Sequence, residues 1–418
     1  MREAAAVSAL AVTLGLALHR PVLLSRLRVG PGLAAGLGVL ILLVTGGLPA
    51  RAVAEAAAVL WRPLVALASI MVMTGVAARV GLFERLAALL VPRGRAGAGR
   101  LFGLVFTLSL ATAAVFNNDA AVLVLTPVVV ALVRALYPDT PELLVPFAFA
   151  VFVAAGVAPF LTSNPMNTVV AGVAGIDFIT YARRMVPVAL AAAVVTFAVL
   201  WRLFAARLAA APPPAAQPPA PAWTVGQRRT FGLVLLALAG YPLVALAGWQ
   251  VYAVAAAGAA GALGLAWWHG AGRPVSVLRT AVAWDVLTFL LGMYLLARGL
   301  QRIGVVGWLG ELYAGGGPPV IGLVSAAGSA LINNHAMALT NLLAIQELPG
   351  GGEEAYLAAL IGGDLGPRLL PVGSLAGLLW LSLLGRLGVT VSLRRFVLVG
   401  AAVTVPSLAA SLAVLALG

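Results

Sequence analysis

Residues 101–133 read LFGLVFTLSLATAAVFNNDAAVLVLTPVVVALV, and Asp119 is the only charged residue in this apolar run. The pieces on either side of Phe116-Asn117-Asn118-Asp119, residues 101–116 and 120–133, are each shorter than the about 20 residues that a helix needs to cross a bilayer core. We therefore predict a re-entrant hairpin with a polar tip, at about residues 101–136.

A second apolar run, residues 317–346, repeats this design. Here Ile332-Asn333-Asn334-His335 interrupts the apolar sequence. The same reasoning predicts a second hairpin over about residues 317–346, with its polar tip at the two asparagines.

Two other long apolar runs contain helix-breaking residues. Residues 143–176 are interrupted by Thr162-Ser163-Asn164-Pro165-Met166-Asn167, and residues 355–384 by Asp364-Leu365-Gly366-Pro367 and Pro371-Val372-Gly373-Ser374. Such breaks free backbone amides and carbonyls, which are tolerated at membrane depth only where they line a cavity inside the protein. We therefore predict one broken helix in each run.

The composition agrees with a membrane protein. Of the 418 residues, 62% are apolar, 9% are charged and none is cysteine, whereas soluble domains are roughly 45–50% apolar and about 25% charged. This excludes a cytosolic enzyme, a disordered chain and a disulfide-rich secreted scaffold, and no β-barrel alternation is visible. The net charge of +13 comes from dispersed arginines, which are typical of cytoplasmic loops and do not indicate nucleic-acid binding.

The apolar segments divide into two sets of six around a proline-rich stretch. We expect an N-terminal unit at 1–207, a cytoplasmic linker at 208–229 and a C-terminal unit at 230–418. If the hairpins do not cross, each unit crosses about five times, and an odd number inverts the second unit. The predicted fold is an all-α polytopic membrane protein with an inverted repeat of about 5+5 transmembrane helices, each half having one re-entrant hairpin and one broken helix.

The arginines also predict an orientation. With the N-terminus outside, most arginines fall in cytoplasmic loops, as the positive-inside rule requires, and the acidic Glu347, Glu353 and Glu354 fall outside. The acidic 139–142 loop and the Arg183-Arg184 pair are exceptions.

Ionisable residues at membrane depth cost about 2.5–3.5 kcal/mol and mark transport pathways. Asp119, Asp364 and His335 are the deep candidates, and we assign them to proton coupling. A structural alternative is that Asp119 accepts backbone amides at the hairpin tip and that His335 bonds a tip carbonyl. Asp177 and Asp285 lie near span ends, where an interfacial helix cap or a loop charge is expected.

Amide and hydroxyl side chains at the four interruptions are the candidate substrate ligands, and they suit a hydroxylated neutral solute or an anion equally well. They are Asn117, Asn118, Ser163, Asn164, Asn167, Asn333, Asn334 and Ser374. Enzyme and nucleotide-binding motifs are absent from the sequence, and without cysteine there is no thiolate metal site. We expect no enzyme activity, cofactor or metal; energy would come from an ion gradient, the membrane potential or a separate ATPase.

Two motifs resemble those of a known family. FNNDAAVLVLTP at 116–127 and GGDLGPRLLPVGSLAGLLW at 362–380 are similar to signatures of the ArsB-type arsenite efflux permeases of the ion transporter superfamily. Leu331-Ile332-Asn333-Asn334 and Ser163-Asn164 also fit, whereas His335 replaces an expected hydrophobic residue.

The resemblance implies export of arsenite and antimonite through the cell inner membrane, with hairpins and broken helices around the substrate and an elevator motion in some relatives. A soluble arsenical ATPase as partner and a homodimer are open expectations. Arsenite near neutral pH is mainly As(OH)3, which a cysteine-free chain must bind through hydrogen bonds, and a proton on Asp119 or Asp364 could be exchanged for it. A sodium–proton or carboxylate transporter remains the alternative, followed by a non-transporting scaffold.

Overall fold

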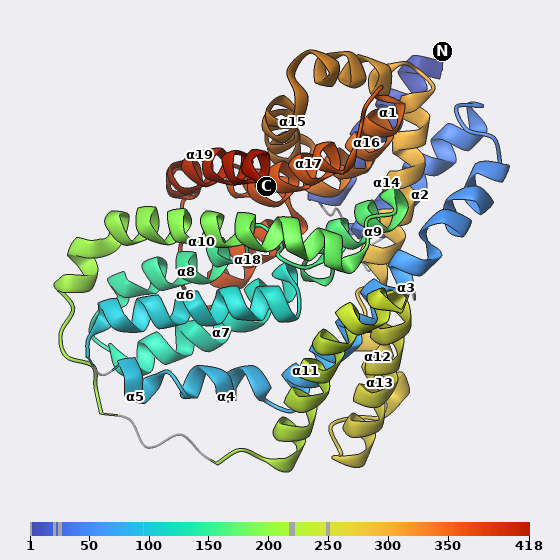
Figure 1. Ribbon diagram of the computed structural model, residues 1–418. Coiled ribbons are helices and arrows are strands. Elements are labelled where there is room, and N and C mark those ends of the chain that lie inside the picture. Colours follow the sequence, from blue (N-terminus) through green and yellow to red (C-terminus); the bar gives the residue numbers. More distant parts are fainter. Residues whose placement is uncertain (1, 20–21, 24–26, 95, 217–221, 248–250) are drawn as a thin grey trace.

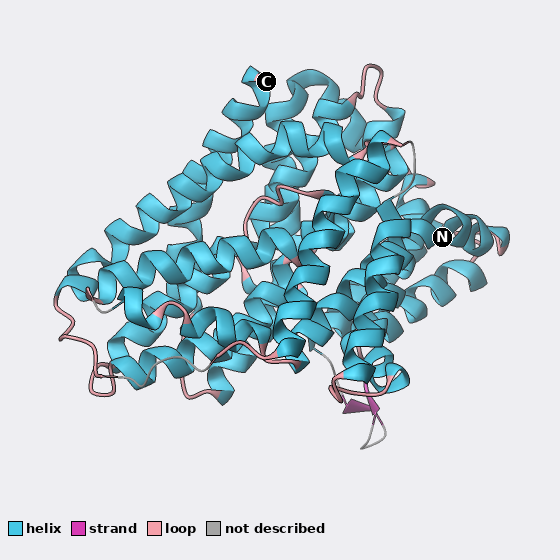
Figure 2. Ribbon diagram, turned by 60° about the horizontal axis from the view of Figure 1, so that its bottom comes forward, coloured by secondary structure: helices cyan, strands magenta, loops and turns pink. Residues whose placement is uncertain are grey.

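The structure is a computed structural model that describes residues 2–19, 22–23, 27–94, 96–216, 222–247 and 251–418. These ranges are almost entirely helical, and their only strands are β1 (Val22–Leu23) and β2 (Leu27–Arg28), which pair antiparallel (Figure 2). The first-half helices are α1 (Arg2–His19), α2 (Pro31–Val44), α3 (Arg51–Arg79), α4 (Leu82–Ala88), α5 (Val91–Gly94), α6 (Ala98–Val115), α7 (Asn118–Leu136), η1 (Pro141–Leu143), α8 (Leu144–Ala154), η2 (Leu161–Ser163), α9 (Pro165–Ala174) and α10 (Phe178–Ala209).

The second half follows a connection that is shorter than the predicted 208–229 linker, since α10 continues to Ala209 and the next helix begins at Val225. Its helices are α11 (Val225–Leu246), α12 (Val251–Trp268), α13 (Pro274–Ala281), α14 (Trp284–Gln301), α15 (Val305–Ile332), α16 (Asn334–Glu347), α17 (Glu353–Leu365), η3 (Gly366–Arg368), η4 (Pro371–Gly373), α18 (Leu375–Arg386) and α19 (Leu393–Leu417).

Five described helices are long and apolar enough to cross a membrane: α3, α6, α10, α15 and α19. The pair α13 and α14, bent by 50° at its break, would be a sixth span. The other apolar helices in the described ranges are shorter than a full span. These features agree with a polytopic membrane protein, whereas the inverted repeat of about five crossings in each half stays a prediction.

Each of the four predicted interruptions separates two helices. The first lies between α6 and α7 at Phe116–Asn117, and the second at Asn333, between α15 and α16. The helix α15 is itself kinked at Gly317 (φ 61°, ψ −163°), where the second hairpin was expected to begin. The first broken helix is interrupted between α8 and α9, and the second between α17 and α18. A proline occupies the first position of α9, where proline is favoured.

The helices interlock across the two halves (Figure 1). In this view α6, α7, α8 and α10 lie beside one another, with α19 along α10. The second arm of each polar hairpin contacts a broken helix of the other half: α7 packs against α18, and α16 packs against α9. Phe152 of α8 stacks on Trp380 of α18 with ring centroids 4.5 Å apart. The interruptions are thereby held close together in the interior.

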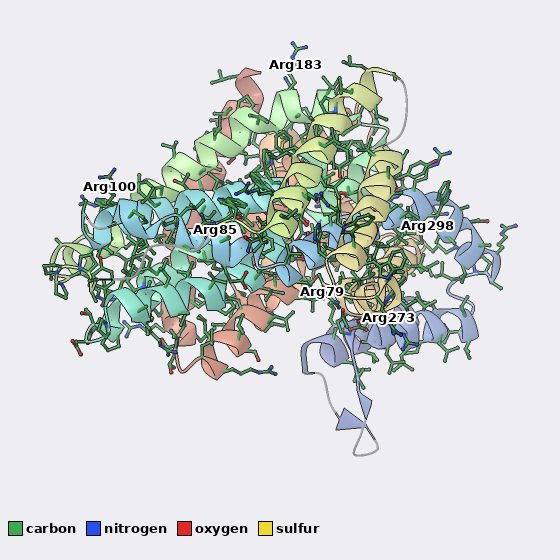
Figure 3. The ribbon with its side chains drawn as sticks, turned by 90° about the horizontal axis from the view of Figure 1, so that it is seen from below. Arg79, Arg85, Arg100, Arg183, Arg273 and Arg298 are labelled. Carbon is green, nitrogen blue, oxygen red and sulfur yellow. The ribbon has the colours of Figure 1, made fainter. Side chains whose placement is uncertain are left out.

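Several arginines lie near helix ends and on different sides of the molecule, as Figure 3 shows for Arg100, Arg183 and Arg298. Arg79, at the end of α3, donates to the backbone carbonyls of Ala271 and Ser276, each at 3.3 Å. This distribution matches dispersed loop charges and differs from the single basic stripe of a nucleic-acid-binding surface.

Candidate functional site

Asp364, in the last turn of α17, is the centre of a hydrogen-bond network. The residue is 7% exposed, and its carboxylate accepts from the backbone N–H of Ala158 (2.9 Å), from Asn164 Nδ2 (2.6 Å) and from Asn167 Nδ2 (3.1 Å). All three donors belong to the break between α8 and α9 or to the first turn of α9. A carboxylate from the second broken helix therefore forms hydrogen bonds with the segment that interrupts the first broken helix.

The two asparagines also organise their own helix. Asn164 caps α9, because its Oδ1 accepts from the N–H of Met166 at 3.0 Å. Asn167 Nδ2 donates to Tyr181 Oη (2.5 Å), and the Tyr181 hydroxyl donates to the carbonyl of Ala158 (3.0 Å). A chain of hydrogen bonds thus joins α10, α9 and α17.

Arg368 is a site residue that the sequence analysis missed. It lies in η3, is 3% exposed, and donates to the carbonyl of Val153 and to Thr196 Oγ1 (3.3 Å). Its Nε has no hydrogen-bond partner among the described residues. The signal was present, because Asp364 and Arg368 are the only charges in residues 355–384 and a deep arginine is as costly as a deep aspartate.

A small cavity of about 40 Å³ lies where the four interruptions meet. Its polar lining comes from α7, the α8–α9 break, the start of α16, the end of α17 with η3, and the cap of α18: Asn118, Asp119, Asn164, Asn334, Asp364, Arg368 and Ser374. Val122, Phe152, Ala155, Pro367 and Ala376 complete the lining. Since one water needs about 10–15 Å³ by this measure, the cavity holds only a small solute.

Five of the predicted site residues lie outside this lining. Ser163 donates to the carbonyl of Ala114 at 2.7 Å, and Asn167 stands behind Asp364. Asn117, Asn333 and His335 are buried but do not line the cavity. Their roles as substrate or proton ligands therefore stay predictions.

The start of α16 has an unusual backbone. Asn333 is the only non-glycine residue with positive φ (83°) in the described chain, and its side chain caps α16 by accepting from the N–H of His335 at 3.0 Å. His335 Nδ1 lies 2.7 Å from Asn334 Oδ1, and its ring packs edge-on against Phe289 with centroids 5.8 Å apart. Its buried Nε2 has no partner among the described residues.

The carboxylate of Asp119 differs from that of Asp364, because no described residue donates a hydrogen bond to it. The neighbouring Asn118 is engaged, since its Nδ2 donates to the carbonyl of Gly156 at 2.9 Å. The tip is thus fixed to the α8–α9 break through Asn118, while Asp119 lines the cavity without a donor among the described residues.

Of the two aspartates expected near span ends, Asp177 is a helix cap, whereas Asp285 lies in the first turn of α14 and does not cap that helix. Asp177 caps α10 by accepting from the N–H groups of Ile179 (2.8 Å) and Thr180 (3.0 Å). Burial raises its pKa, but these bonds and that from the Thr180 hydroxyl outweigh burial, so the pKa is lowered overall. Asp285 accepts from the N–H of Gly32 at 2.8 Å, at the start of α2.

The profile of the family described as arsenical pump membrane protein (ArsB) matches residues 5–417. The chain is 34% identical over 411 residues to an arsenical pump membrane protein of Escherichia coli K12, covering 93% of this chain and 94% of that protein. It is 27% identical over 373 residues to an uncharacterized transporter of Mycobacterium tuberculosis, with 84% of each covered.

The fold is similar to the crystal structure of the YdaH transporter of Alcanivorax borkumensis. The TM-score is 0.59 at 17% identity, with 100% of this chain and 97% of that chain covered. This likeness concerns the fold alone, whereas the family profile covers nearly the whole sequence. On that ground, the chain belongs to the arsenical pump membrane protein (ArsB) family.

Proposed function

We propose that this multi-pass inner-membrane protein exports arsenite and antimonite from the cytoplasm, driven by the proton gradient or the membrane potential. The observation that carries the proposal is the cavity at the four interruptions, lined by amide, hydroxyl and carboxylate groups in a chain without cysteine. Such a site can hold As(OH)3 or Sb(OH)3 through hydrogen bonds alone.

The cavity offers both donors and acceptors to a cluster of hydroxyls. Asn334 Oδ1 faces His335, which leaves its Nδ2 as a donor, and the Ser374 hydroxyl accepts from Gly377 N–H at 2.9 Å and keeps its own proton to donate. Asn118 Oδ1 and the carboxylate of Asp119 supply acceptors. Each hydroxyl of As(OH)3 both donates and accepts, so this mixed set matches its chemistry.

The charges favour a neutral solute over a carboxylate. Two acids, Asp119 and Asp364, and one base, Arg368, line the cavity, so its charge is negative or neutral. The only cation in the described lining is already bonded to Val153 and Thr196. An incoming carboxylate would therefore meet no net positive charge, which removes the main attraction expected of a carboxylate site.

For coupling, we propose that a proton on Asp119, Asp364 or His335 is exchanged for the solute. An elevator motion would carry the hairpins and broken helices past the remaining helices as one body, which the interlocking of α7 with α18 and of α16 with α9 supports. A soluble arsenical ATPase partner and a homodimer stay predictions.

The test is arsenite accumulation in cells that lack other arsenite exporters. Cells with the protein should contain less arsenite than vector controls, and a protonophore should restore accumulation. A variant carrying Asp139→Asn, at an exposed loop position, should behave like wild type. Unchanged accumulation with the protein present in the membrane would contradict the proposal, and a requirement for sodium would move the coupling to that ion.

A further inference from the structure

Asp364 and Arg368, four residues apart, bind complementary backbone groups where α8 ends and the α8–α9 break begins. Asp364 accepts from the N–H of Ala158, and Arg368 donates to the carbonyl of Val153 in the last turn of α8. A helix that ends leaves N–H and C=O groups without intrahelical partners. The two side chains therefore replace hydrogen bonds that the break removes.

The fit of Arg368 against this break is close. A Cβ on Gly156 would lie 2.3 Å from Arg368 Nη2, and a Cβ on Gly400 would lie 1.8 Å from the Arg368 carbonyl oxygen. Glycine at both positions lets the arginine reach Val153. The guanidinium is thus held by Val153 and Thr196 and packed against Gly156.

The opposite charges of this pair compensate each other inside the protein. Asp364 and Arg368 are 7% and 3% exposed and interact electrostatically, although they do not form a direct ion pair within 4.0 Å. Removing one partner of a buried charge pair leaves an uncompensated charge, which is strongly destabilising, whereas removing both is often tolerated. Each residue is therefore expected to need the other.

We propose that Arg368 is the fixed counter-charge of Asp364 and a positioning residue of the transport site. Because this pairing holds Asp364 in place, Asp119 is the cavity carboxylate that takes up and releases the coupled proton. The inference rests on the proposed arsenite–proton exchange and assigns its proton.

The surroundings of the two carboxylates support this division. Three donors and a nearby guanidinium offset part of the cost of burying the ionised form of Asp364. Asp119 receives no hydrogen bond from a described residue, and Asp364 and Arg368 are the other charged groups in the described cavity lining. Protonating Asp119 breaks no hydrogen bond between described residues, whereas protonating Asp364 would disturb the bonds that it accepts from the α8–α9 break.

The test measures arsenite uptake into inside-out membrane vesicles with and without an acid-inside pH gradient. The variants are Asp119→Asn, Asp364→Asn, Arg368→Gln, Arg368→Lys and the double variant Asp364→Asn/Arg368→Gln. Exposed Asp139→Asn and Arg386→Gln are matched controls with the same chemical changes. The readouts are the uptake rate and the ratio of rates with and without the gradient.

We expect each single change at Asp364 or Arg368 to Asn or Gln to lower the uptake rate about tenfold, within the range of coupling measured for interacting residues. The double variant should exceed both singles and keep a ratio above one, and Arg368→Lys should retain more uptake than Arg368→Gln. Asp119→Asn should bring the ratio to one.

A double variant no better than its worse single change would overturn the pairing. Loss of the gradient response in Asp364→Asn, with the response kept in Asp119→Asn, would overturn the proton assignment. If wild-type vesicles take up no arsenite, the proposed function fails instead. The pairing is then judged by melting temperature in detergent, where the double variant must exceed both singles.

Discussion

Asn164 makes two hydrogen bonds that serve different purposes. Its Oδ1 caps α9 and its Nδ2 donates to Asp364. We expect Asn164→Ala to lower the free energy of unfolding by about 2–4 kcal/mol, since about 1 kcal/mol is lost from the cap and a buried carboxylate loses a donor. Thermal unfolding in detergent measures this loss.

The control is Ser374→Ala, because Ser374 caps α18 without a hydrogen bond to Asp364 and should cost only about 1 kcal/mol. Asn164→Asp keeps the cap acceptor but brings a second carboxylate to Asp364, and should be worse than alanine. Equal losses for Asn164→Ala and Ser374→Ala would show that the bond to Asp364 contributes nothing.

The positive φ of Asn333 gives a second prediction for a single residue. Asn333→Gly should cost only a few tenths of a kcal/mol, because glycine adopts this backbone readily and is an acceptable helix start. Asn333→Val should cost about 2–3 kcal/mol through strain and the lost cap. Melting temperatures decide the matter, and equal values for the two variants would show that the backbone there is unstrained.

For single residues, the sequence predicted which polar side chains lie in the site better than it predicted their hydrogen-bond partners. Asp364, Asn164 and Asn334 could be identified because the backbone groups that a helix break frees at membrane depth need polar side chains as hydrogen-bond partners. Arg368 was missed because it belongs to a chain with many arginines and only its depth distinguishes it. Tyr181 could not be found, since its role depends on how α10 packs against α9.

The helices α15 and α17 approach through their backbones. A Cβ on Gly362 would lie 2.2 Å from the carbonyl oxygen of Gly322, and one on Gly366, the first residue of η3, would lie 2.2 Å from that of Ala326. Small residues permit such contacts between membrane helices. Because a backbone oxygen cannot rotate away, Gly362→Ala must separate α17 from α15 and displace Asp364, which α17 carries.

We therefore expect Gly362→Ala to lower the melting temperature and to abolish most arsenite efflux. The same change at Gly385 of α18, where nothing lies within 4 Å of the added carbon, should be neutral or stabilising by up to about 1 kcal/mol. Efflux assays and melting curves of the two variants test this, and a functional Gly362→Ala protein would contradict the tight α15–α17 contact.

The interruptions were the most predictable elements, and the span count was the least. The predicted break at Asp364-Leu365-Gly366-Pro367 coincides with the end of α17 at Leu365, whereas α8 already ends at Ala154, eight residues before the predicted break begins at Thr162. The kink of α15 at Gly317 joins a preceding helix to the second hairpin, so apolar length alone does not show how many times this region crosses the membrane.

Across the whole molecule, neither half builds the cavity alone. Asn118, Asp119 and Asn164 come from the first half, and Asn334, Asp364, Arg368 and Ser374 come from the second. If the halves are inverted, their hairpins enter from opposite sides of the membrane and their tips meet at the cavity. In this arrangement, a solute in the cavity would contact one hairpin that enters from the cytoplasmic side and one that enters from the outside.

The chain contains no cysteine, so single cysteines can report this topology without background. In the inverted arrangement, the ends of the two hairpins lie on opposite sides of the membrane. Asp139→Cys, after α7, should then react with a membrane-impermeant maleimide only in permeabilised cells. Gln346→Cys, at the end of α16, should react in intact cells. Both positions are exposed. Ala215→Cys in the linker and Arg183→Cys near the start of α10 are the cytoplasmic and external references. The acidic 139–142 loop departs from the positive-inside rule, whereas the number of crossings in the inverted arrangement places it in the cytoplasm. Labelling of Asp139→Cys in intact cells would therefore mean that the first hairpin crosses the membrane and that the halves are not inverted.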